Sequence, residues 1–110
     1  MYKVIKHISI SGAHFLSLNY ESKCANLHGH NWEIDVYLAS EVLDENGMVM
    51  DFSKIKKKVE ILDHANVNEV INPLNPTAEN IAKWICDEMG PKCYKVKVIE
   101  SDGNIAIFEK

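Results

Sequence analysis

The chain has 110 residues, of which 46% are hydrophobic and 25% are charged, and its formal net charge is -4. This composition is typical of a folded globular domain. Nothing in it suggests nucleic-acid binding, which requires a basic face. No apolar run is long enough to span a membrane. We therefore expect a single domain over residues 1–110 that is cytoplasmic and has no nucleic-acid or membrane partner.

The cysteine content favours free thiols. An odd number of cysteines, without the spacing of a disulfide framework, fits a reducing compartment, and the N-terminal residues lack the hydrophobic core of a signal peptide. The three cysteines are Cys24, Cys86 and Cys93. Cys86 falls within a predicted helix, where we expect a small core residue.

The first predicted element is a strand over residues 2–10, which are rich in β-branched side chains and roughly alternate. His7 lies in mid-strand without a partner motif, so we expect a structural or surface role for it. Gly12, just before His14, indicates a bulge or a close approach of another backbone. Residues 15–27 form a long polar connection, and long connections in small domains are often functional.

The second predicted strand covers residues 30–40, and alternate residues form its core face. These residues are His30, Trp32, Ile34, Val36 and Leu38. Residues two apart in a strand point to the same side. We therefore expect His28 and His30 to converge on one point at the end of this buried face.

The histidine pair is a candidate metal site. Imidazole is a common zinc ligand, and a catalytic zinc usually takes three protein ligands. His14 is available as the third, and Cys24 is close enough in sequence to be a fourth ligand or a nearby thiolate base. A His-x-His pair alone is weak evidence, because most such pairs are solvated or hydrogen-bonded strand residues. Histidine and cysteine within one short segment strengthen the zinc prediction.

In the middle of the chain, the sequence pattern predicts a turn, a short extended piece and a helix. Asn46-Gly47 is a strong turn signal, residues 48–50 favour an extended piece, and Asp51 is a suitable helix N-cap. The helix has an apolar stripe at helical spacing. The stripe consists of Phe52, Ile55, Val59 and Leu62.

Asp63 and His64 follow at the end of this helix. Adjacency in sequence does not make a hydrogen-bonded acid–base pair, because such pairs are defined by geometry. Alternatively, Asp63 lies at the surface and His64 caps the C-terminal end of the helix, where a cation is favoured. The residues alone leave both interpretations open.

A second helix is predicted after the proline-containing break at residues 72–76. Thr77 is its expected N-cap, and Gly90, followed by a proline, is its expected end. The buried stripe is predicted to consist of Ile81, Ile85 and Met89.

Two further strands are predicted over residues 93–100 and 104–108. Glu100 continues an apolar face, and a buried carboxylate without a partner is costly, so we expect a lysine, a backbone edge or a ligand with donor groups beside it. The order strand, strand, helix, helix, strand, strand predicts an α+β fold. Its four-stranded antiparallel sheet carries two helices on one face.

Six motifs follow one another in a specific order. They are Ala13-His14, Cys24-x-x-x-His28-Gly29-His30, Gly47-Met48-Val49-Met50-Asp51-Phe52, Leu62-Asp63-His64, Asn75-Pro76-Thr77-x-Glu79-Asn80 and Glu100-Ser101. Together they resemble the 6-pyruvoyl-tetrahydropterin synthase superfamily, and most of all its 6-carboxy-tetrahydropterin synthases. The resemblance spans residues 9–101. The three-residue gap between Cys24 and His28 is similar to the carboxy-forming branch.

The resemblance implies a quaternary structure and a set of site residues. Three subunits would join their sheets into a barrel, and two trimers would stack into a homohexamer with active sites at subunit interfaces, which would cover the sheet edges. The implied zinc ligands are His14, His28 and His30. The implied general base is Cys24, the acid–base pair is Asp63 with His64, and the pterin-binding residues are Glu100 and, near the ring, Thr77.

The implied substrate is 7,8-dihydroneopterin triphosphate. The carboxy branch forms 6-carboxy-tetrahydropterin with release of acetaldehyde and triphosphate, on the route to deazaguanine-modified tRNA (the queuosine or archaeosine type). One alternative is a 6-pyruvoyl-tetrahydropterin synthase in a tetrahydrobiopterin-type pathway. An alternative of another class is a pterin-binding protein without turnover, although a binding module does not need Cys24 together with Asp63 and His64.

Overall fold

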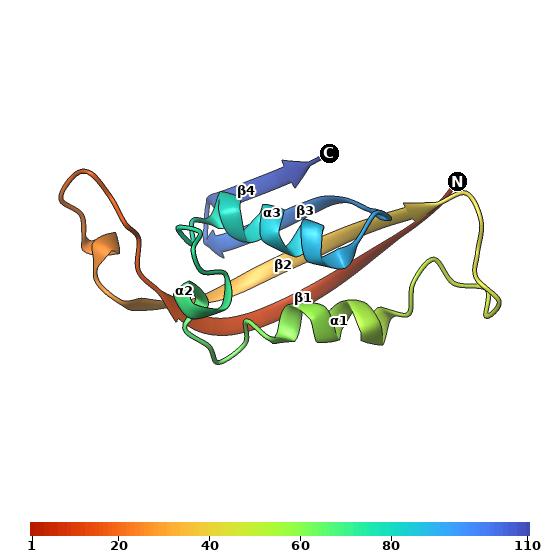
Figure 1. Cartoon of the computed structure of the whole chain (residues 1–110), viewed down its shortest axis with the longest axis horizontal. Helices are drawn as coiled ribbons and strands as arrows, with labels where there is room; N and C mark the ends of the chain where they lie inside the picture. The colour runs from red at the N-terminus through yellow and green to blue at the C-terminus, as the bar shows by residue number, and fades with distance from the viewer.

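The computed structural model describes residues 1–110 and consists of one four-stranded sheet with helices on one side (Figure 1). All neighbouring strands are antiparallel, and their order in the sheet is their order in the chain. The strands are β1 (Tyr2–His14), β2 (His28–Ser40), β3 (Cys93–Ser101) and β4 (Asn104–Glu109). The predicted α+β fold is confirmed, with β1 and β4 at the two edges of the sheet.

The first strand is four residues longer than the sequence indicated. Residues 2–10 were expected to be extended, but pairing with β2 continues without a bulge through Gly12, opposite His30, and His14, opposite His28. The expected close approach at Gly12 is confirmed, because a Cβ atom there would lie 3.0 Å from the Ala65 carbonyl oxygen. The longer strand brings His14 next to the histidine pair of β2.

Two longer helices, α1 (Phe52–Glu60) and α3 (Ala78–Met89), lie on one side of the sheet and contact each other (Figure 1). Two shorter elements were not predicted: a 3-10 turn, η1 (Lys23–Ala25), and a one-turn helix, α2 (Val67–Val70). No helix combines the length and the apolar character that crossing a bilayer requires. The loop that carries η1 extends away from the end of the sheet (Figure 1).

The predicted caps are confirmed. The Asp51 carboxylate accepts a hydrogen bond from Ser53 N at 2.8 Å, and Thr77 Oγ1 accepts one from Asn80 N at 3.1 Å. Side-chain caps of this type satisfy amide groups that have no partner within the helix. Gly90 ends α3 with a φ of +97°, a backbone conformation that favours glycine.

The core lies between the sheet and the two helices. The expected inner face of β2 is confirmed, and its apolar residues are completely buried. Burial of each such side chain contributes about 1.5–3 kcal/mol. The core residues of the sheet and the helices include Ile8, Ile10, Trp32, Ile34, Val36, Leu38, Ile55, Val59, Ile81, Ile85, Val96 and Val98.

Three details around α1 correct the prediction. Phe52 was expected in the buried stripe but is 50% exposed. Leu62 is buried as expected, but it lies after the helix, which ends at Glu60. Residues 48–50 form no strand, although Val49 is buried.

Candidate functional site

Three histidine rings converge at the end of the sheet where the pairing of β1 with β2 ends. The ring centroids of His14 and His28 are 4.6 Å apart, those of His14 and His30 are 5.0 Å apart, and those of His28 and His30 are 4.9 Å apart. One nitrogen of each ring lies within 4.8 Å of the others, a spacing at which the three side chains could hold one metal ion. The expected convergence is therefore confirmed.

The hydrogen bonds of two rings leave their Nε2 atoms free to bind a metal. His14 Nδ1 is 2.8 Å from the Pro76 carbonyl oxygen, and His28 Nδ1 is 2.6 Å from that of Asn26. A carbonyl oxygen only accepts, so each Nδ1 carries the proton and each Nε2 presents a lone pair. Ligand histidines in metal sites are commonly oriented in this way.

Two of the three Nε2 atoms, those of His14 and His30, are also buried, which is costly without a partner. His14 Nε2 and His30 Nε2 are both inaccessible to solvent and make no hydrogen bond. Each buried polar atom without a partner costs about 1–3 kcal/mol. Burial lowers the pKa of His14 below its ordinary value, so the ring is neutral at neutral pH. Imidazole is a preferred ligand of zinc, so the three histidines fit the metal that the sequence predicted.

Trp32 packs against two of the histidines. Its ring is completely buried and meets His14 and His30 edge-on, with centroid distances of 5.0 Å and 5.2 Å. The sequence assigned Trp32 only to the core. The alternation of β2 places it two residues from His30 on the same face, and this signal identifies it as a neighbour of the site.

Glu100 lies beside the same histidines. Its Oε1 atom is 3.6 Å from His14 Nε2 and 3.8 Å from His30 Nε2, and no lysine contacts it. Glu100 also lines a cavity of about 540 Å³ together with Leu16, Thr77 and part of β4. The structure thus brings the two predicted pterin-binding residues, Glu100 and Thr77, into one cavity that adjoins the candidate metal centre.

Cys24 is held on η1, in the connection between β1 and β2. Its side chain is half-buried, its carbonyl accepts a hydrogen bond from Leu16 N at 2.8 Å, and its amide donates to Ser22 Oγ at 3.2 Å. The group of converging ligand atoms contains the three histidines and not Cys24. Cys24 therefore lies outside the ligand group that the three histidines form.

Asp63 and His64 lie along the free edge of β1. Asp63 Oδ1 accepts a hydrogen bond from Ser11 N at 2.8 Å, and His64 N donates one to Ser11 O at 2.5 Å. His64 Nε2 is 3.7 Å from Asp63 Oδ2, and the ring is 83% exposed. No hydrogen bond or ion pair joins this pair to the three histidines. His64 does not cap α1, because Glu60 is the last residue of that helix.

The backbone of His64 is held in a strained conformation. Its φ is +54°, which costs a residue with a side chain about 1–2 kcal/mol relative to a right-handed conformation. The bonds to Ser11 hold it there, and backbone strain of this kind clusters at functional sites. No residue pattern around His64 indicates this conformation.

Comparison with known proteins agrees with the geometry. Residues 3–110 match the family model described as 6-pyruvoyl tetrahydropterin synthase. The chain is 39% identical to the 6-carboxy-5,6,7,8-tetrahydropterin synthase of Synechocystis, over 92% of this chain and 88% of that protein. It is 36% identical to the dihydroneopterin monophosphate aldolase of Pyrococcus furiosus, over 79% of this chain and 74% of that protein.

A solved structure extends the likeness to three dimensions. The 6-pyruvoyl tetrahydropterin synthase of Caenorhabditis elegans superposes with a TM-score of 0.77 and 29% sequence identity, covering 99% of this chain and 95% of that chain. The family match over nearly the whole chain agrees with the resemblance seen in the sequence motifs. The chain belongs to the 6-pyruvoyl tetrahydropterin synthase family of enzymes that act on pterins.

Proposed function

We propose that this protein is a zinc-dependent lyase that converts 7,8-dihydroneopterin triphosphate into 6-carboxy-5,6,7,8-tetrahydropterin, with release of acetaldehyde and triphosphate. The observation that carries the proposal is the cluster of three histidines, in which His14 and His30 have buried, unpartnered Nε2 atoms beside Glu100. The likeness to the Synechocystis enzyme supports the carboxy product. The pathway that we propose is deazaguanine biosynthesis of the queuosine or archaeosine type, in the cytoplasm.

His14, His28 and His30 would hold the zinc ion through their Nε2 atoms. When bound, zinc supplies a Lewis acid that lowers the pKa of the hydroxyl groups on the substrate side chain. The Pro76 and Asn26 carbonyls keep the His14 and His28 rings in the tautomer that leaves Nε2 unprotonated.

Glu100 would bind the pterin ring. A pterin presents a ring N–H and an amino group side by side, and a carboxylate accepts both hydrogen bonds together. The adjoining cavity, which Thr77 also lines, is large enough for a small heterocycle. Because Glu100 Oε1 is within 4 Å of two histidine nitrogens, the proposed pterin site would adjoin the proposed metal centre.

The proton transfers would be divided between two groups. The Cys24 thiolate would remove a proton from the substrate side chain, and His64, oriented by Asp63, would move protons on the opposite side. Within one chain, His64 is exposed and does not contact the histidine cluster. This placement supports a site completed by the Asp63–His64 pair of a neighbouring subunit.

A homohexamer of two stacked trimers would provide that neighbour. β1 is long, and both edge strands carry exposed apolar residues on the open face of the sheet, namely Ile5 on β1 and Ile105 and Ile107 on β4. Uncovered edges of this kind promote association, and closing three sheets into a barrel would cover them. We therefore propose the hexamer that the family resemblance implies.

Two other reactions have specific support. The Caenorhabditis elegans structure favours a 6-pyruvoyl product in a tetrahydrobiopterin-type pathway, and the Pyrococcus furiosus relative favours an aldolase acting on dihydroneopterin monophosphate. The proposed site does not discriminate among these reactions, so the products and the accepted substrate separate them. A pterin-binding protein without turnover is the remaining alternative.

The test is a product analysis of zinc-loaded protein. The protein is incubated with 7,8-dihydroneopterin triphosphate and, separately, with the monophosphate, and the mixtures are analysed by mass spectrometry. A 6-carboxy product with acetaldehyde is the expected result. A 6-pyruvoyl product, or cleavage of the monophosphate only, would replace the proposed reaction by the corresponding alternative. Bound but intact substrate would favour the binding protein and remove the catalytic roles of Cys24 and His64.

A further inference from the structure

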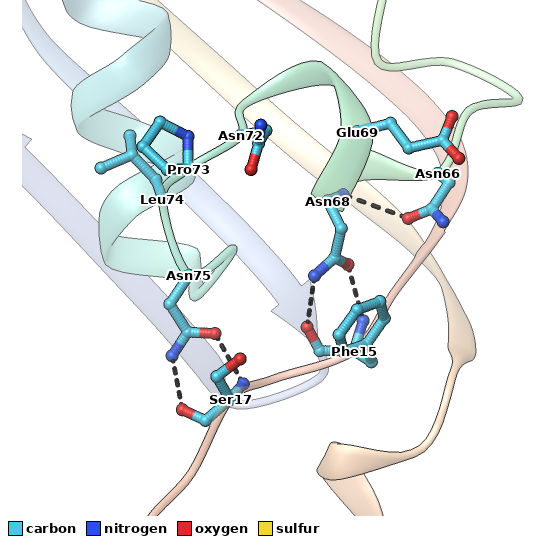
Figure 2. A pocket seen from close by; sticks show the side chains of 9 residues that line it. All are labelled: Phe15, Ser17, Asn66, Asn68, Glu69, Asn72, Pro73, Leu74 and Asn75. Carbon is cyan, nitrogen blue, oxygen red and sulfur yellow. Dashed lines mark hydrogen bonds between the residues drawn. The ribbon is translucent and has the colours of Figure 1, made fainter.

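Two asparagines hold the start of the connection between β1 and β2 (Figure 2). The Asn68 carboxamide accepts a hydrogen bond from Phe15 N at 2.8 Å and donates one to Phe15 O at 2.9 Å. The Asn75 carboxamide makes the same pair of bonds with Ser17, at 2.8 Å to N and 3.0 Å to O. Each side chain thus pairs with the backbone as a residue of a neighbouring antiparallel strand would.

Leu16, which lies between Phe15 and Ser17, holds Cys24 in place. Leu16 N donates a hydrogen bond of 2.8 Å to the Cys24 carbonyl. Apart from the Asn26 carbonyl, which contacts His28, the other hydrogen bonds of residues 18–26 stay within residues 22–26. The position of Cys24 relative to β1 therefore depends on residues 15–17, and these residues depend on Asn68 and Asn75.

Both asparagines are themselves fixed to the body of the protein. Asn68 lies in α2, next to the completely buried Val67, and its amide donates to Asn66 Oδ1 at 3.1 Å. Asn75 lies at the start of α3, where its carbonyl accepts hydrogen bonds from Thr77 N at 2.8 Å and Asn80 Nδ2 at 2.9 Å. The loop itself makes few contacts. The two carboxamides connect it to elements that pack on the core.

The cavity beside these residues is rich in asparagine, but the asparagines face the chain itself. The cavity has a volume of about 640 Å³, and its polar lining would suit a polar ligand. In Figure 2, however, the carboxamides of Asn68 and Asn75 are directed at the backbone of residues 15 and 17. Their arrangement points to a role in holding this segment rather than in binding a ligand.

We propose that Asn68 and Asn75 are positioning residues for the reaction, because they fix the loop that sets Cys24 relative to the three histidines. This inference rests on the proposed function, in which Cys24 is the base. His14 directly precedes the held segment, and its ring bonds to the Pro76 carbonyl, next to Asn75. The same two segments therefore fix a metal ligand and the loop of the base, and a small displacement between reacting groups strongly slows a reaction.

The decisive variant is Asn68→Leu, because Asn75 is next to residues that contact His14 and cap α3. Leucine has nearly the shape of asparagine but makes no hydrogen bond with Phe15. Glu69→Leu is the matched control, since Glu69 lines the same cavity, is exposed and makes no side-chain hydrogen bond. Asn68→Asp is a conservative variant that keeps the acceptor for Phe15 N and loses the donor to Phe15 O.

Five quantities are measured on the full-length, zinc-loaded protein: kcat, KM, zinc content, the rate of trypsin cleavage and the rate of alkylation. In Asn68→Leu we expect kcat to fall by about ten- to a hundredfold, with KM within about threefold of the unmodified protein and with full zinc content. Trypsin cleavage after Lys23 and alkylation of Cys24 by iodoacetamide should both become faster, while the buried Cys86 and Cys93 stay unreactive. Asn68→Asp should give intermediate values, and Glu69→Leu should match the unmodified protein.

The outcomes separate the parts of the proposal. If Lys23 is cleaved and Cys24 is alkylated in Asn68→Leu at the same rates as in the unmodified protein, the proposal that Asn68 holds the loop is refuted. A loosened loop with unchanged kcat would refute the positioning role. If the unmodified protein does not turn over any pterin, the proposed function fails, and the proteolysis and alkylation rates still decide whether Asn68 holds the loop. If Asn68→Leu does not fold, Asn75→Leu and Asn68→Asp provide the same comparison.

Discussion

Removal of zinc should destabilise this protein strongly. Without a metal, the folded chain keeps the Nε2 atoms of His14 and His30 buried and unpartnered, at about 1–3 kcal/mol for each atom. A metal that binds only the folded chain stabilises it by RT ln(1 + [L]/Kd), which is about 2.7 kcal/mol when free zinc is a hundredfold above Kd. The two estimates agree in size, so a contribution of roughly 3 kcal/mol is expected.

The assay is thermal unfolding with a zinc buffer and with a chelator. For a domain of about 100 residues, each kcal/mol shifts Tm by roughly 4–8 °C, so a loss of roughly 3 kcal/mol on chelation should lower Tm by about 12–24 °C. His28→Ala should abolish this zinc dependence and reduce the zinc content measured by metal analysis. We choose His28 because it is only half-buried, so its truncation leaves no large void.

His7→Ala is the matched control. His7 is also a strand histidine, but it lies on the open face of the sheet, where it contacts Asp35 and Glu33. Its replacement should leave the zinc content and the zinc-dependent shift of Tm unchanged. The reasoning would be refuted if the Tm of the unmodified protein did not respond to zinc, or if His28→Ala retained full zinc.

Three further predictions concern other parts of the molecule. Cys24→Ala should lower turnover by about 10²–10⁴-fold, measured by product formation, while zinc content is unchanged. Gly12→Ala should lower the free energy of unfolding by about 1–3 kcal/mol in denaturant titration, because the new Cβ would lie 3.0 Å from Ala65 O and 3.1 Å from a second carbonyl oxygen. His7→Gln should destabilise the protein by less than about 1 kcal/mol near pH 5.5, and the effect should vanish at alkaline pH.

The sign of the last prediction follows from the two shifted groups. The hydrogen bond to Asp35 raises the pKa of His7 above 6.5, so its contribution is complete below that value and is lost as the pH rises through the folded-state pKa. The hydrogen bond from Ser9 lowers the pKa of Glu33 below 4.5, so its contribution persists until the pH falls through the folded-state pKa. The cluster is therefore most stabilising between about pH 4.5 and 6.5.

Each prediction has an outcome that contradicts it. Unchanged turnover in Cys24→Ala would remove this thiol from the mechanism. If Gly12→Ala were as stable as the unmodified protein, the segment that contains Ala65 would be able to move away from β1. A loss of stability in His7→Gln that grows with pH would mean that the neutral ring, and not the imidazolium, stabilises the cluster.

The sequence by itself determined the four strands, the two longer helices and the convergence of His28 and His30. Alternation along residues 30–40 identified the buried face of β2 and placed His28 and His30 on the same side, because the side-chain period of a strand is two. Helical spacing and the caps Asp51 and Thr77 identified α1 and α3. These signals are local, so they can be recognised without knowing which segments meet.

Only the tertiary structure decided how the site is completed. His14 joins the cluster because β1 continues to pair beyond residue 10, and its ring is oriented by the Pro76 carbonyl, 62 residues away in the chain. A backbone carbonyl has no residue-specific signal, so no pattern in the sequence indicates this contact. The same holds for Asn68 and Asn75, whose side chains bond to a backbone that any residue could supply. Local periodicity reports the direction of a side chain, whereas contacts between distant segments depend on the packed fold.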